Sequence, residues 1–326
     1  MRFSVVAPGI LLASIMLLPA ARCGGETPAR IELQNDPEAG NLRVSMDGRE
    51  ILVYQYADDV DLPHCWPLRS PSGKNMLVQK TEPYPHHRSF WFADTVRLDG
   101  GREVSTYNAF YSGRKRGEND FAPPFRDHVR HLSFRRLEAI GDEAVVEADL
   151  VWEMDVDRPV LNESRRMTVR ALEDGEYSME MTFVLTAVCG DVEFVSDDVH
   201  YAWPYLRVQT RFSGERGGVI TSDTGAAGQE ATNGETALWM DYSNTVEGIT
   251  EGIAVFQKPD GEEHRWLTRE YGCFGPRRAD ARSGRPFTLR KGDSLSQCVN
   301  ILVHRGDAVT GRVAERYRDW IAGRVE

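Results

Sequence analysis

Residues 143–154, EAVVEADLVWEM, decide the fold class of this chain. One set of alternate positions is entirely apolar: Ala144, Val146, Ala148, Leu150, Trp152 and Met154. The other set is largely acidic: Glu143, Val145, Glu147, Asp149, Val151 and Glu153. A period of two residues gives an extended strand one apolar and one polar face, which is typical of half-buried antiparallel sheet.

The same alternation recurs at residues 177–185, and the Asp174-Gly175 turn predicts a hairpin with residues 166–172. Shorter strands are expected near residues 42–46, 51–56, 192–195, 205–212, 236–242, 252–257 and 298–304. Only the last twenty residues have helical spacing, at Val309, Val313, Tyr317, Trp320 and Ile321. Many strands and little helix indicate an all-β sandwich or barrel, and we expect a large antiparallel β-sandwich with a C-terminal helix.

The N-terminus has the pattern of a secretory signal peptide: a positive charge at Arg2, an apolar run, and the small residues Ala20 and Ala21. We expect residues 1–23 to be the signal peptide, 24–30 a linker and 31–326 one β-sandwich domain. Residues 97–127 and 213–235 are poorly patterned and are expected to form long loops.

Export to the periplasm or the extracellular space follows from this signal. Cys23 lies where a lipoprotein cysteine would lie, but Arg22 occupies a position that normally carries a small residue, which disfavours a lipid anchor. No later apolar run reaches the length of a membrane-spanning helix, so we expect a soluble mature protein.

Charge and cysteine spacing exclude several functions. Removing Arg2 and Arg22 from a chain of net charge −11 leaves −13, a sign that repels nucleic acid and anionic membranes. Cys65, Cys189, Cys273 and Cys298 are widely spaced without a CxxC pair, which disfavours a zinc site. They are either small buried hydrophobic residues or partners in one or two disulfides.

The first chemical cluster is YPHHRSFWF at residues 84–92, where His86, His87 and Arg88 precede a run of aromatics that includes Trp91. Carbohydrate sites combine stacking rings, arginines that bind carboxylates or hydroxyls, and histidines that transfer protons. If this segment is a strand, consecutive side chains point to opposite faces, so one imidazole enters the pocket. The alternative is that the histidines only hydrogen-bond a strand end.

Two further clusters combine arginine with aromatics: residues 197–207, with His200, Tyr201 and Arg207, and residues 266–272, with Trp266, Arg269 and Tyr271. Taken singly, each also fits a structural role in the core. Metal binding through His86, His87 and His200 lacks an HxH or HExxH spacing, so we predict no metal and no cofactor. GxSxG, P-loop and dinucleotide-binding motifs are absent from the sequence.

These clusters, in this order, resemble the DUF6807 family of bacterial secreted proteins, often labelled "PmoA family". Residues 84–93 read YPHHRSFWFA where the family has HPHHRSLWFA. Residues 62–73 resemble its KPYxxPLxxPxG, residues 238–243 its AxWVDYSG, and residues 303–307 also fit. The resemblance implies a sandwich akin to the galactose mutarotase-like supersandwich, in a family common in polysaccharide-degrading bacteria.

The sequence departs from the family pattern at several polar positions. Tyr84 replaces the first His, Leu267 the second residue of WHxRDYG, and His200 and Tyr201 stand at the Lys and Glu positions of GDTKEG. These departures indicate a divergent member with an altered substrate, or one that binds without turnover. Methane oxidation, which the label suggests, is rejected because the mature part has no spanning segments.

We therefore expect an exported enzyme acting on a sugar or oligosaccharide, most plausibly anionic, by hydrolysis, elimination or epimerisation. The predicted proton-transfer residues are His86, His87, His200, Tyr201 and Tyr271, and the predicted substrate-binding residues are Arg88, Trp91, Arg207, Trp266 and Arg269. The alternative is a non-catalytic carbohydrate-binding sandwich, with a metal-dependent oxidoreductase third. The expected partner is a small-molecule or oligosaccharide substrate, and neither nucleic acid nor a membrane span is expected.

Overall fold

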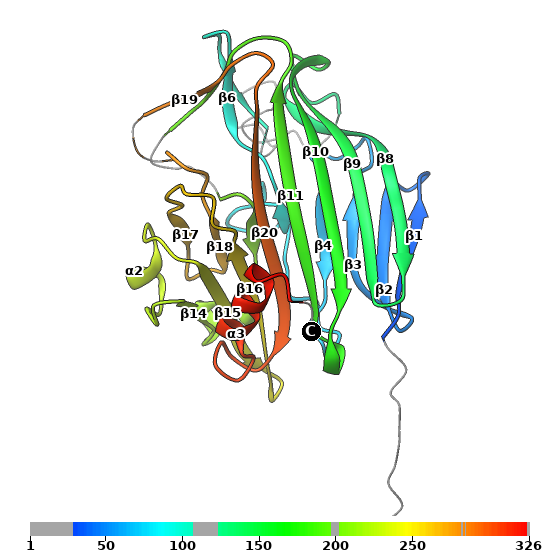
Figure 1. Cartoon of the computed structure of the whole chain (residues 1–326), viewed down its shortest axis with the longest axis vertical. Helices are drawn as coiled ribbons and strands as arrows, with labels where there is room; N and C mark the ends of the chain where they lie inside the picture. Colours follow the sequence, from blue (N-terminus) through cyan, green and yellow to red (C-terminus); the bar gives the residue numbers. More distant parts are fainter. Residues whose placement is uncertain (1–28, 107–122, 197–201, 282, 284, 325–326) are drawn as a thin grey trace, which may run out of the picture.

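The computed structural model describes residues 29–106, 123–196, 202–281, 283 and 285–324. It confirms the antiparallel β-sandwich with a C-terminal helix: two eight-stranded sheets lie face to face (Figure 1). Neighbouring strands within each sheet pair antiparallel. The predicted signal peptide lies outside the described residues. None of the helices in the described ranges is long and apolar enough to cross a membrane.

The first sheet begins with an N-terminal meander and ends with short strands from the second half of the chain. Its spatial order is β1 (Ile31–Asp36), β2 (Asn41–Met46), β3 (Arg49–Gln55), β4 (His64–Leu68), β5 (Phe90–Trp91), β13 (Tyr205–Arg207), β18 (Cys273–Pro276) and β17 (Trp266–Thr268).

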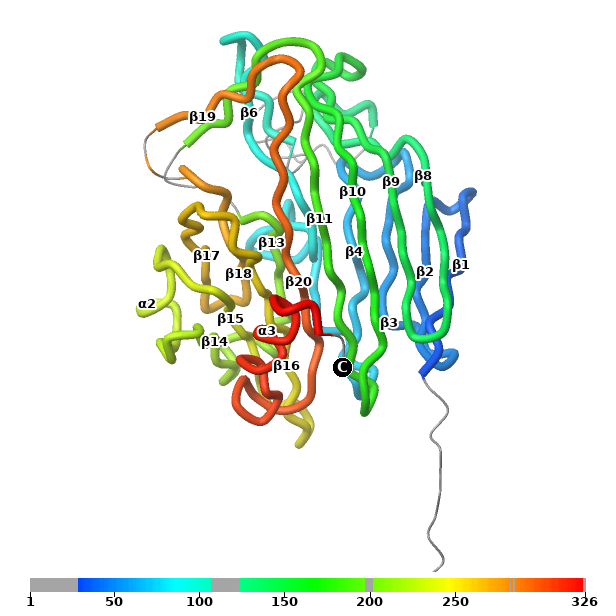
Figure 2. The backbone as a smooth tube through the Cα atoms, viewed as in Figure 1, coloured from blue at the N-terminus to red at the C-terminus, as the bar shows by residue number. Residues whose placement is uncertain are grey.

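The second sheet contains the long strands that the alternation predicts. Its spatial order is β14 (Val219–Ser222), β15 (Trp239–Val246), β16 (Ile249–Gln257), β20 (Ser294–Arg305), β11 (Tyr177–Ala187), β10 (Arg158–Ala171), β9 (Glu143–Met154) and β8 (His128–Ile140). Strand β20 joins two meanders that are far apart in sequence, because it pairs with β16 on one side and β11 on the other (Figure 2).

A small third sheet and short helices complete the described structure. The sheet contains β19 (Phe287–Leu289), β12 (Val192–Phe194), β6 (Thr95–Leu98) and β7 (Glu103–Ser105). Helix α2 (Gln229–Thr232) is a single turn, and α3 (Val313–Ile321) packs on the outer face of the second sheet. Three 3₁₀ turns lie at Glu173–Gly175, Thr210–Phe212 and Gly214–Arg216.

Two local expectations need correction, and the structure decides between the two alternatives for the cysteines. The two segments expected to be loops contain elements too short to leave a periodic signal: 97–127 contains β7, and 213–235 contains β14 and α2. Val309 lies before α3 and is 83% exposed, so it does not belong to the buried face of the helix. Cys65, Cys189, Cys273 and Cys298 are all free, so the disulfide alternative is wrong. Cys65 and Cys273 are buried, as expected for small hydrophobic residues, whereas Cys189 is exposed and Cys298 is partly exposed.

Aromatic contacts and a buried ion pair fill the space between the two large sheets. Phe92, just after β5, stacks on Phe183 of β11 with ring centroids 3.8 Å apart. Arg165 donates a 2.7 Å hydrogen bond to Glu163, which also accepts one from Trp152 Nε1 at 2.8 Å. Both charged side chains are at most 3% exposed. The pair is therefore compensated within the core, where an unpaired charge would be costly.

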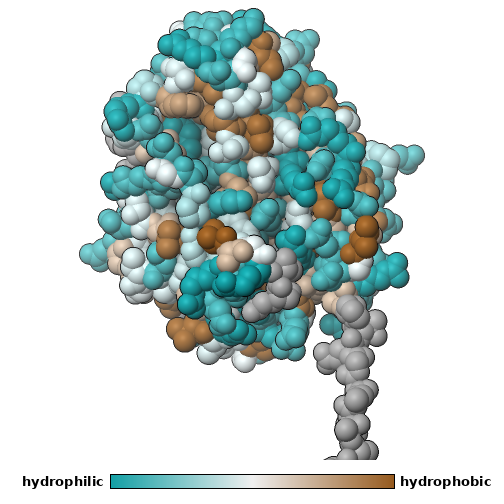
Figure 3. Space-filling view, in the orientation of Figure 1, coloured by the Kyte–Doolittle hydropathy of each residue, from teal (hydrophilic) through white to brown (hydrophobic). Residues whose placement is uncertain are grey.

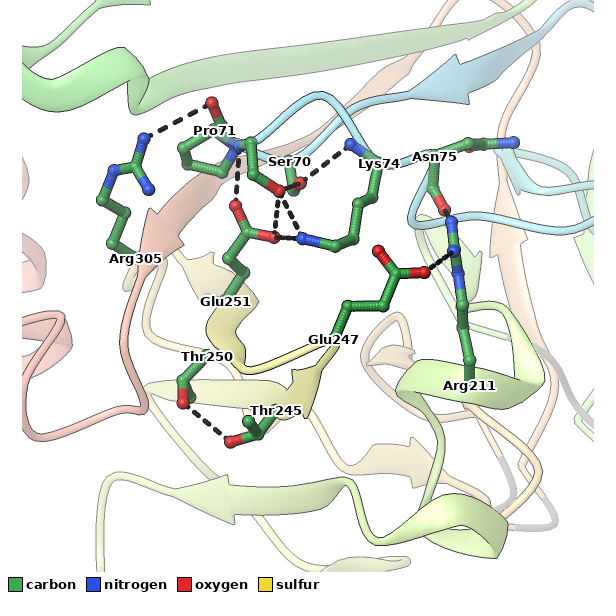
Figure 4. Close-up of polar contacts among 11 residues, drawn as sticks. Ser70, Pro71, Lys74, Asn75, Arg211, Thr245, Glu247, Thr250, Glu251 and Arg305 are labelled. Atoms are coloured by element: carbon green, nitrogen blue, oxygen red, sulfur yellow. Dashed lines mark hydrogen bonds and ion pairs between the residues drawn. The ribbon is translucent and has the colours of Figure 1, made fainter.

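A polar contact ties the segment after β4 to the second sheet (Figure 4). Glu251 of β16 accepts hydrogen bonds from the Ser72 backbone N–H at 2.7 Å and from its hydroxyl at 2.8 Å. Lys74 Nζ lies 3.4 Å from the same carboxylate. Burial opposes ionisation of Glu251, but the hydrogen bonds from the serines and Lys74 lower its pKa overall. The motif at residues 62–73 thus helps to hold the two sheets together.

A second buried pair joins β15 to β20 across β16. His304 Nε2 lies 2.7 Å from Asp241 Oδ1, and its Nδ1 lies 3.0 Å from the Arg305 carbonyl oxygen. Gly252 of β16 makes room for the pair, because a Cβ there would lie 2.7 Å from the imidazole. Burial opposes the charge on His304, but Asp241 raises its pKa above 6.5 overall. Both ring nitrogens face acceptors, so the imidazolium is the form that this site stabilises.

Glu163→Gln should lower the free energy of unfolding by about 3–5 kcal/mol, because it leaves the Arg165 guanidinium buried without its counter-charge. The matched control is Glu138→Gln, which removes the exposed Arg136–Glu138 pair and should change stability little, because water and salt screen such a pair. Urea unfolding of the three proteins measures both effects. Equal losses in the two variants would show that the buried pair has no special role.

The His304–Asp241 pair should make stability decrease as the pH rises. Because the folded-state pKa of His304 is raised above 6.5, its contribution is fully present below that pH and is lost as the pH passes the folded-state value. Urea unfolding at a series of pH values should show this slope in the wild type, and His304→Asn and Asp241→Asn should both reduce it. A wild-type slope that both variants retain would contradict the assignment.

Candidate functional site

The candidate site lies on the outer face of the first sheet, away from the sandwich core. Phe92 points toward the second sheet, so the preceding Trp91 points to the opposite face. There Trp91 contacts Tyr205, its partner in register on β13, with ring centroids 4.2 Å apart. His64 of β4 pairs with Trp91 from the other side and therefore shares this face. Three neighbouring strands thus present aromatic rings to one side of the sheet.

Turns in residues 81–88 place further rings against Trp91 and Tyr205. The His87 N–H donates to the Tyr84 carbonyl oxygen at 3.0 Å, and the two imidazoles of His86 and His87 meet edge to face with centroids 4.6 Å apart. The expectation that the two imidazoles point to opposite faces is wrong, because it assumed a strand and β5 begins only at Phe90. Both histidines belong to the same cluster.

His87 lies at the centre of this ring cluster, which we define as Tyr84, His86, His87, Trp91, Tyr205 and Tyr271. Its imidazole stacks on Tyr84 at 5.0 Å and contacts Tyr205 at 5.4 Å. Tyr271, which arrives from the turn before β18, lies 4.8 Å from Tyr84. His87 is only 2% exposed, whereas Tyr84, His86 and Tyr271 are partly exposed. The accessible edge of the cluster therefore consists of two phenols and one imidazole.

Arg207 supports the cluster from β13. Its Nη1 donates to the backbone oxygens of Tyr84 at 3.0 Å and Thr81 at 3.2 Å, and the guanidinium lies 5.7 Å from the Tyr84 ring centroid and 5.9 Å from that of Tyr271. Arg207 is 4% exposed, and its Nε has no hydrogen-bond partner among the described residues. A buried cation thus positions the two tyrosines from below.

Burial favours the uncharged forms of His86, His87 and Tyr271. Burial, His86 and Arg207 together lower the pKa of His87 to about 2, and burial with Arg207 lowers that of His86 below 6.5. Burial raises the pKa of Cys273, whose sulfur lies 3.9 Å from His87 Nδ1, to about 12, and it also raises the pKa of Tyr271. At neutral pH, His86 is therefore a partly exposed neutral imidazole that can accept a proton.

Arg88 has a different environment from that of its two histidine neighbours. It is 1% exposed, and its Nε donates to Asp61 Oδ1 at 2.8 Å while Nη2 contacts the same oxygen. Asp61 is also 1% exposed. In this geometry Arg88 fixes the position of the turn segment, and contact with a substrate stays a prediction.

The third sequence cluster divides between core and surface. Trp266 is fully buried and its Nε1 donates to the Ala237 carbonyl oxygen at 2.9 Å, so it packs within the fold. Arg269 is partly exposed, and its Nη1 donates to Asn233 Oδ1 at 2.7 Å. A turn closed by the Gly272 N–H and the Arg269 carbonyl oxygen, 2.9 Å apart, places Arg269 two residues from Tyr271. Arg269 is thus a partly exposed cation close enough to Tyr271 to act electrostatically on its pKa.

The structure therefore brings together five of the predicted site residues: His86, His87, Trp91, Arg207 and Tyr271. His200 and Tyr201 lie outside the described residues. Tyr84 and Tyr205 belong to the cluster, and Cys273 contacts it through His87, although the sequence did not single them out for a role. That the predicted residues line one concave pocket stays a prediction. Among the described residues, no group of three or more His, Cys, Asp or Glu side chains is arranged to hold a metal ion.

Comparison with solved structures finds sugar-active proteins at low identity. The GH36 α-galactosidase AgaA from Geobacillus stearothermophilus matches 86% of this chain at 8% identity and a TM-score of 0.47, and this chain covers 41% of its length. Galactose 1-epimerase from Lactobacillus acidophilus matches 86% of this chain and 100% of its own, at 8% identity and a TM-score of 0.37. A putative aldose 1-epimerase from Escherichia coli K12 matches 85% and 100%, at 11% identity and a TM-score of 0.34.

None of these likenesses assigns an activity to this chain, and no curated protein sequence matches it. The family comparison does assign the chain to a family, because the match covers most of the sequence. The family model DUF6807, described as a family of unknown function, matches residues 41–318. These bounds include all of the motifs that suggested the resemblance, from residue 62 to residue 307. The chain therefore belongs to the DUF6807 family.

Proposed function

We propose that this protein is an exported carbohydrate-active enzyme that acts on an anionic sugar or oligosaccharide by hydrolysis, elimination or epimerisation. The observation that carries the proposal is the ring cluster itself: a neutral, partly exposed imidazole stands beside two partly exposed phenols above a buried guanidinium. Aromatic faces bind the C–H faces of sugar rings, and imidazole and phenol groups exchange protons with hydroxyl or ring carbon atoms.

Exposure distinguishes the residues that could touch a substrate from those that support them. His86 and Tyr271 are accessible enough to transfer protons, and Tyr84 offers a stacking surface. His87, with a pKa of about 2, is too weak a base to act at neutral pH and instead orients His86 and Tyr84. In this proposal His200 and Tyr201 keep their predicted role as further proton-transfer groups.

In this proposal, the positive charge of Arg269 favours sugars that carry a carboxylate. Arg269 is partly exposed two residues from Tyr271, so its guanidinium can pair with the carboxylate of a uronic acid. Arg207, below the rings, adds positive potential but is engaged with backbone oxygens. An acidic protein that binds an acidic substrate needs such a local cation.

The second candidate function is carbohydrate binding without turnover, and one observation favours it. Burial shifts the pKa values of three rings toward the neutral form: His86 and His87 become weaker bases and Tyr271 a weaker acid. A stacking surface without effective proton transfer would bind sugars and leave them unchanged. The two functions differ in whether any product appears.

The test is a screen of the purified mature protein against neutral and uronic-acid-containing poly- and oligosaccharides. New reducing ends indicate hydrolysis, ultraviolet absorbance of unsaturated uronates indicates elimination, and NMR of the sugar indicates epimerisation. Binding by calorimetry without any product would support the non-catalytic alternative. If the protein neither binds nor converts any carbohydrate in the panel, the proposed function is wrong.

On a substrate identified in this way, His86→Ala should lower kcat by about 10²–10⁴-fold, because it removes the accessible proton-transfer group. His131→Ala is the matched control, since His131 is a partly exposed histidine in a different aromatic cluster, with Tyr56 and Phe134, and should leave kcat unchanged. Melting temperatures show whether each variant folds. Full activity in a folded His86→Ala protein would remove His86 from the mechanism.

Arg269→Ala should raise KM for a uronic-acid substrate by about tenfold or more, because a charge-assisted pair present before and during the reaction is lost. Steady-state kinetics on the uronic-acid substrate and on its neutral analogue measure the difference, which should appear only with the former. Arg265→Ala is the control, because Arg265 is an exposed arginine in the same segment that pairs with Glu263. An equal effect on both substrates would indicate a structural role for Arg269.

A further inference from the structure

A cavity lies on the far side of the sandwich, between helix α3 and the outer face of the second sheet. Its volume is about 250 Å³. Strands β10, β11, β20 and β16 form its floor, and α3 forms one wall. Figure 3 views the molecule from this side, where hydrophobic residues are scattered among hydrophilic ones. The ring cluster lies on the outer face of the other sheet, so the two locations are separate.

Strand register explains why the floor of the cavity mixes polar and apolar side chains. Glu180 of β11 pairs with Asn300 of β20, and Asn300 pairs in turn with Phe256 of β16. Residues in register share a face of the sheet, so this row points outward toward α3. Ser178 and Leu302 form the next row on the same face. The floor therefore offers an aromatic ring beside hydrogen-bonding groups.

One face of α3 supplies the wall. Arg316 and Trp320 are four residues apart and hence neighbours on the helix surface. Trp320 Nε1 donates to Glu180 Oε2 at 2.5 Å, and the Trp320 ring lies 6.1 Å from that of Phe256. The hydrogen bond fixes the indole orientation, so the cavity has two aromatic rings held in place.

The arginines around the cavity already have acidic partners. Arg170 pairs with Glu143 at 2.7 Å, Arg316 with Glu176 at 2.5 Å and Arg324 with Asp319 at 2.6 Å. An anionic ligand would have to compete with these carboxylates for the guanidinium groups. The cavity is therefore not built for an anion, in contrast to the surroundings of Arg269.

Two buried hydrogen-bonding atoms of the lining remain without a partner among the described residues. They are Oδ1 of Asn300, a residue that is 6% exposed, and Nε of Arg316. One is an acceptor and the other a donor, so a ligand hydroxyl group can satisfy either, donating to Asn300 and accepting from Arg316. A buried polar atom left unpaired is costly, which favours an occupant that carries hydroxyl groups.

From these contacts we infer that the α3 cavity is a second ligand site, which binds one neutral sugar ring. The partly buried Trp320 indole, with the buried Phe256 ring packed against it, contacts the C–H face of the sugar, and Asn300 and Arg316 hydrogen-bond its hydroxyls. At about 30 Å³ for each water molecule in the liquid, the cavity holds roughly eight waters, the space of a single sugar ring. This site does not depend on the proposed function of the ring cluster.

Binding of three small glycosides tests the inference. Methyl β-D-glucopyranoside and methyl β-D-galactopyranoside are neutral probes, and methyl β-D-glucuronide is the anionic one. Calorimetry and saturation-transfer NMR on the wild-type protein should detect at least one neutral glycoside. Asn300→Leu should weaken that binding about tenfold or more, because it removes the buried acceptor while keeping a similar volume.

Ser178→Phe is a second variant, which fills the cavity from its floor and should abolish binding without removing any side-chain hydrogen bond described for the wild type. Its matched control is Ser296→Phe, at an exposed position on the same outer face of β20. Tyr84→Ala, in the ring cluster, should leave unchanged the component of neutral-glycoside binding that Asn300→Leu weakens. Melting temperatures confirm that each variant folds.

Three results would overturn the inference: no neutral glycoside binds the wild type, binding survives in folded Ser178→Phe, or binding is lost in Tyr84→Ala but not in Asn300→Leu. The last result would assign the sugar to the ring cluster. If only the glucuronide binds, the cavity is likewise not the neutral-sugar site.

Discussion

The contact between Phe92 and Phe183 packs the first large sheet against the second and fixes which neighbouring side chains of the first sheet point outward. Because neighbouring residues in extended chain point to opposite faces, placing Phe92 in the core directs Trp91 outward. Tyr205 is in register with Trp91 on the neighbouring strand, so it also points outward, as does Arg207 two residues further along β13. The ring cluster can assemble only on that outer face. A single core contact therefore links the packing of the sandwich to the position of the candidate site.

The sequence predicted the fold class well because the deciding signal is local. Alternation at residues 143–154 and 177–185 reports directly on the half-buried strands β9 and β11. It says nothing about partners, so the position of β20 between two distant meanders could not be predicted. Short elements also escaped prediction, since α2 has four residues and cannot establish a helical period. The local pattern thus predicts the strands, whereas the topology depends on long-range pairing that the pattern does not contain.

The sequence predicted several of the residues that gather at the candidate site, but it did not predict which of them are exposed and which are buried supports. Nothing in the sequence distinguishes Arg88, buried against Asp61, from Arg269, which is partly exposed, because both follow the same rule of arginine beside aromatics. The assumption of a strand at residues 84–88 also separated two imidazoles that a turn brings to within 4.6 Å. Tyr205 was not among the predicted site residues, because the cluster at residues 197–207, taken singly, also fits a structural role in the core. Burial, which only the three-dimensional structure supplies, decides between these alternatives.

The family motifs divide into those that hold the fold and those that build the site. Ser72 and Glu251 join the two sheets, and Asp241 and His304 form a buried pair that needs the absence of a side chain at Gly252. Such contacts tolerate little change, because each substitution leaves a buried partner unpaired. Tyr84 belongs to the other group: it stands where the family pattern has histidine and sits at the partly exposed edge of the ring cluster. A phenol there replaces a base by a stacking surface, so this member departs from the pattern where substrate contact is possible and folding constrains it least.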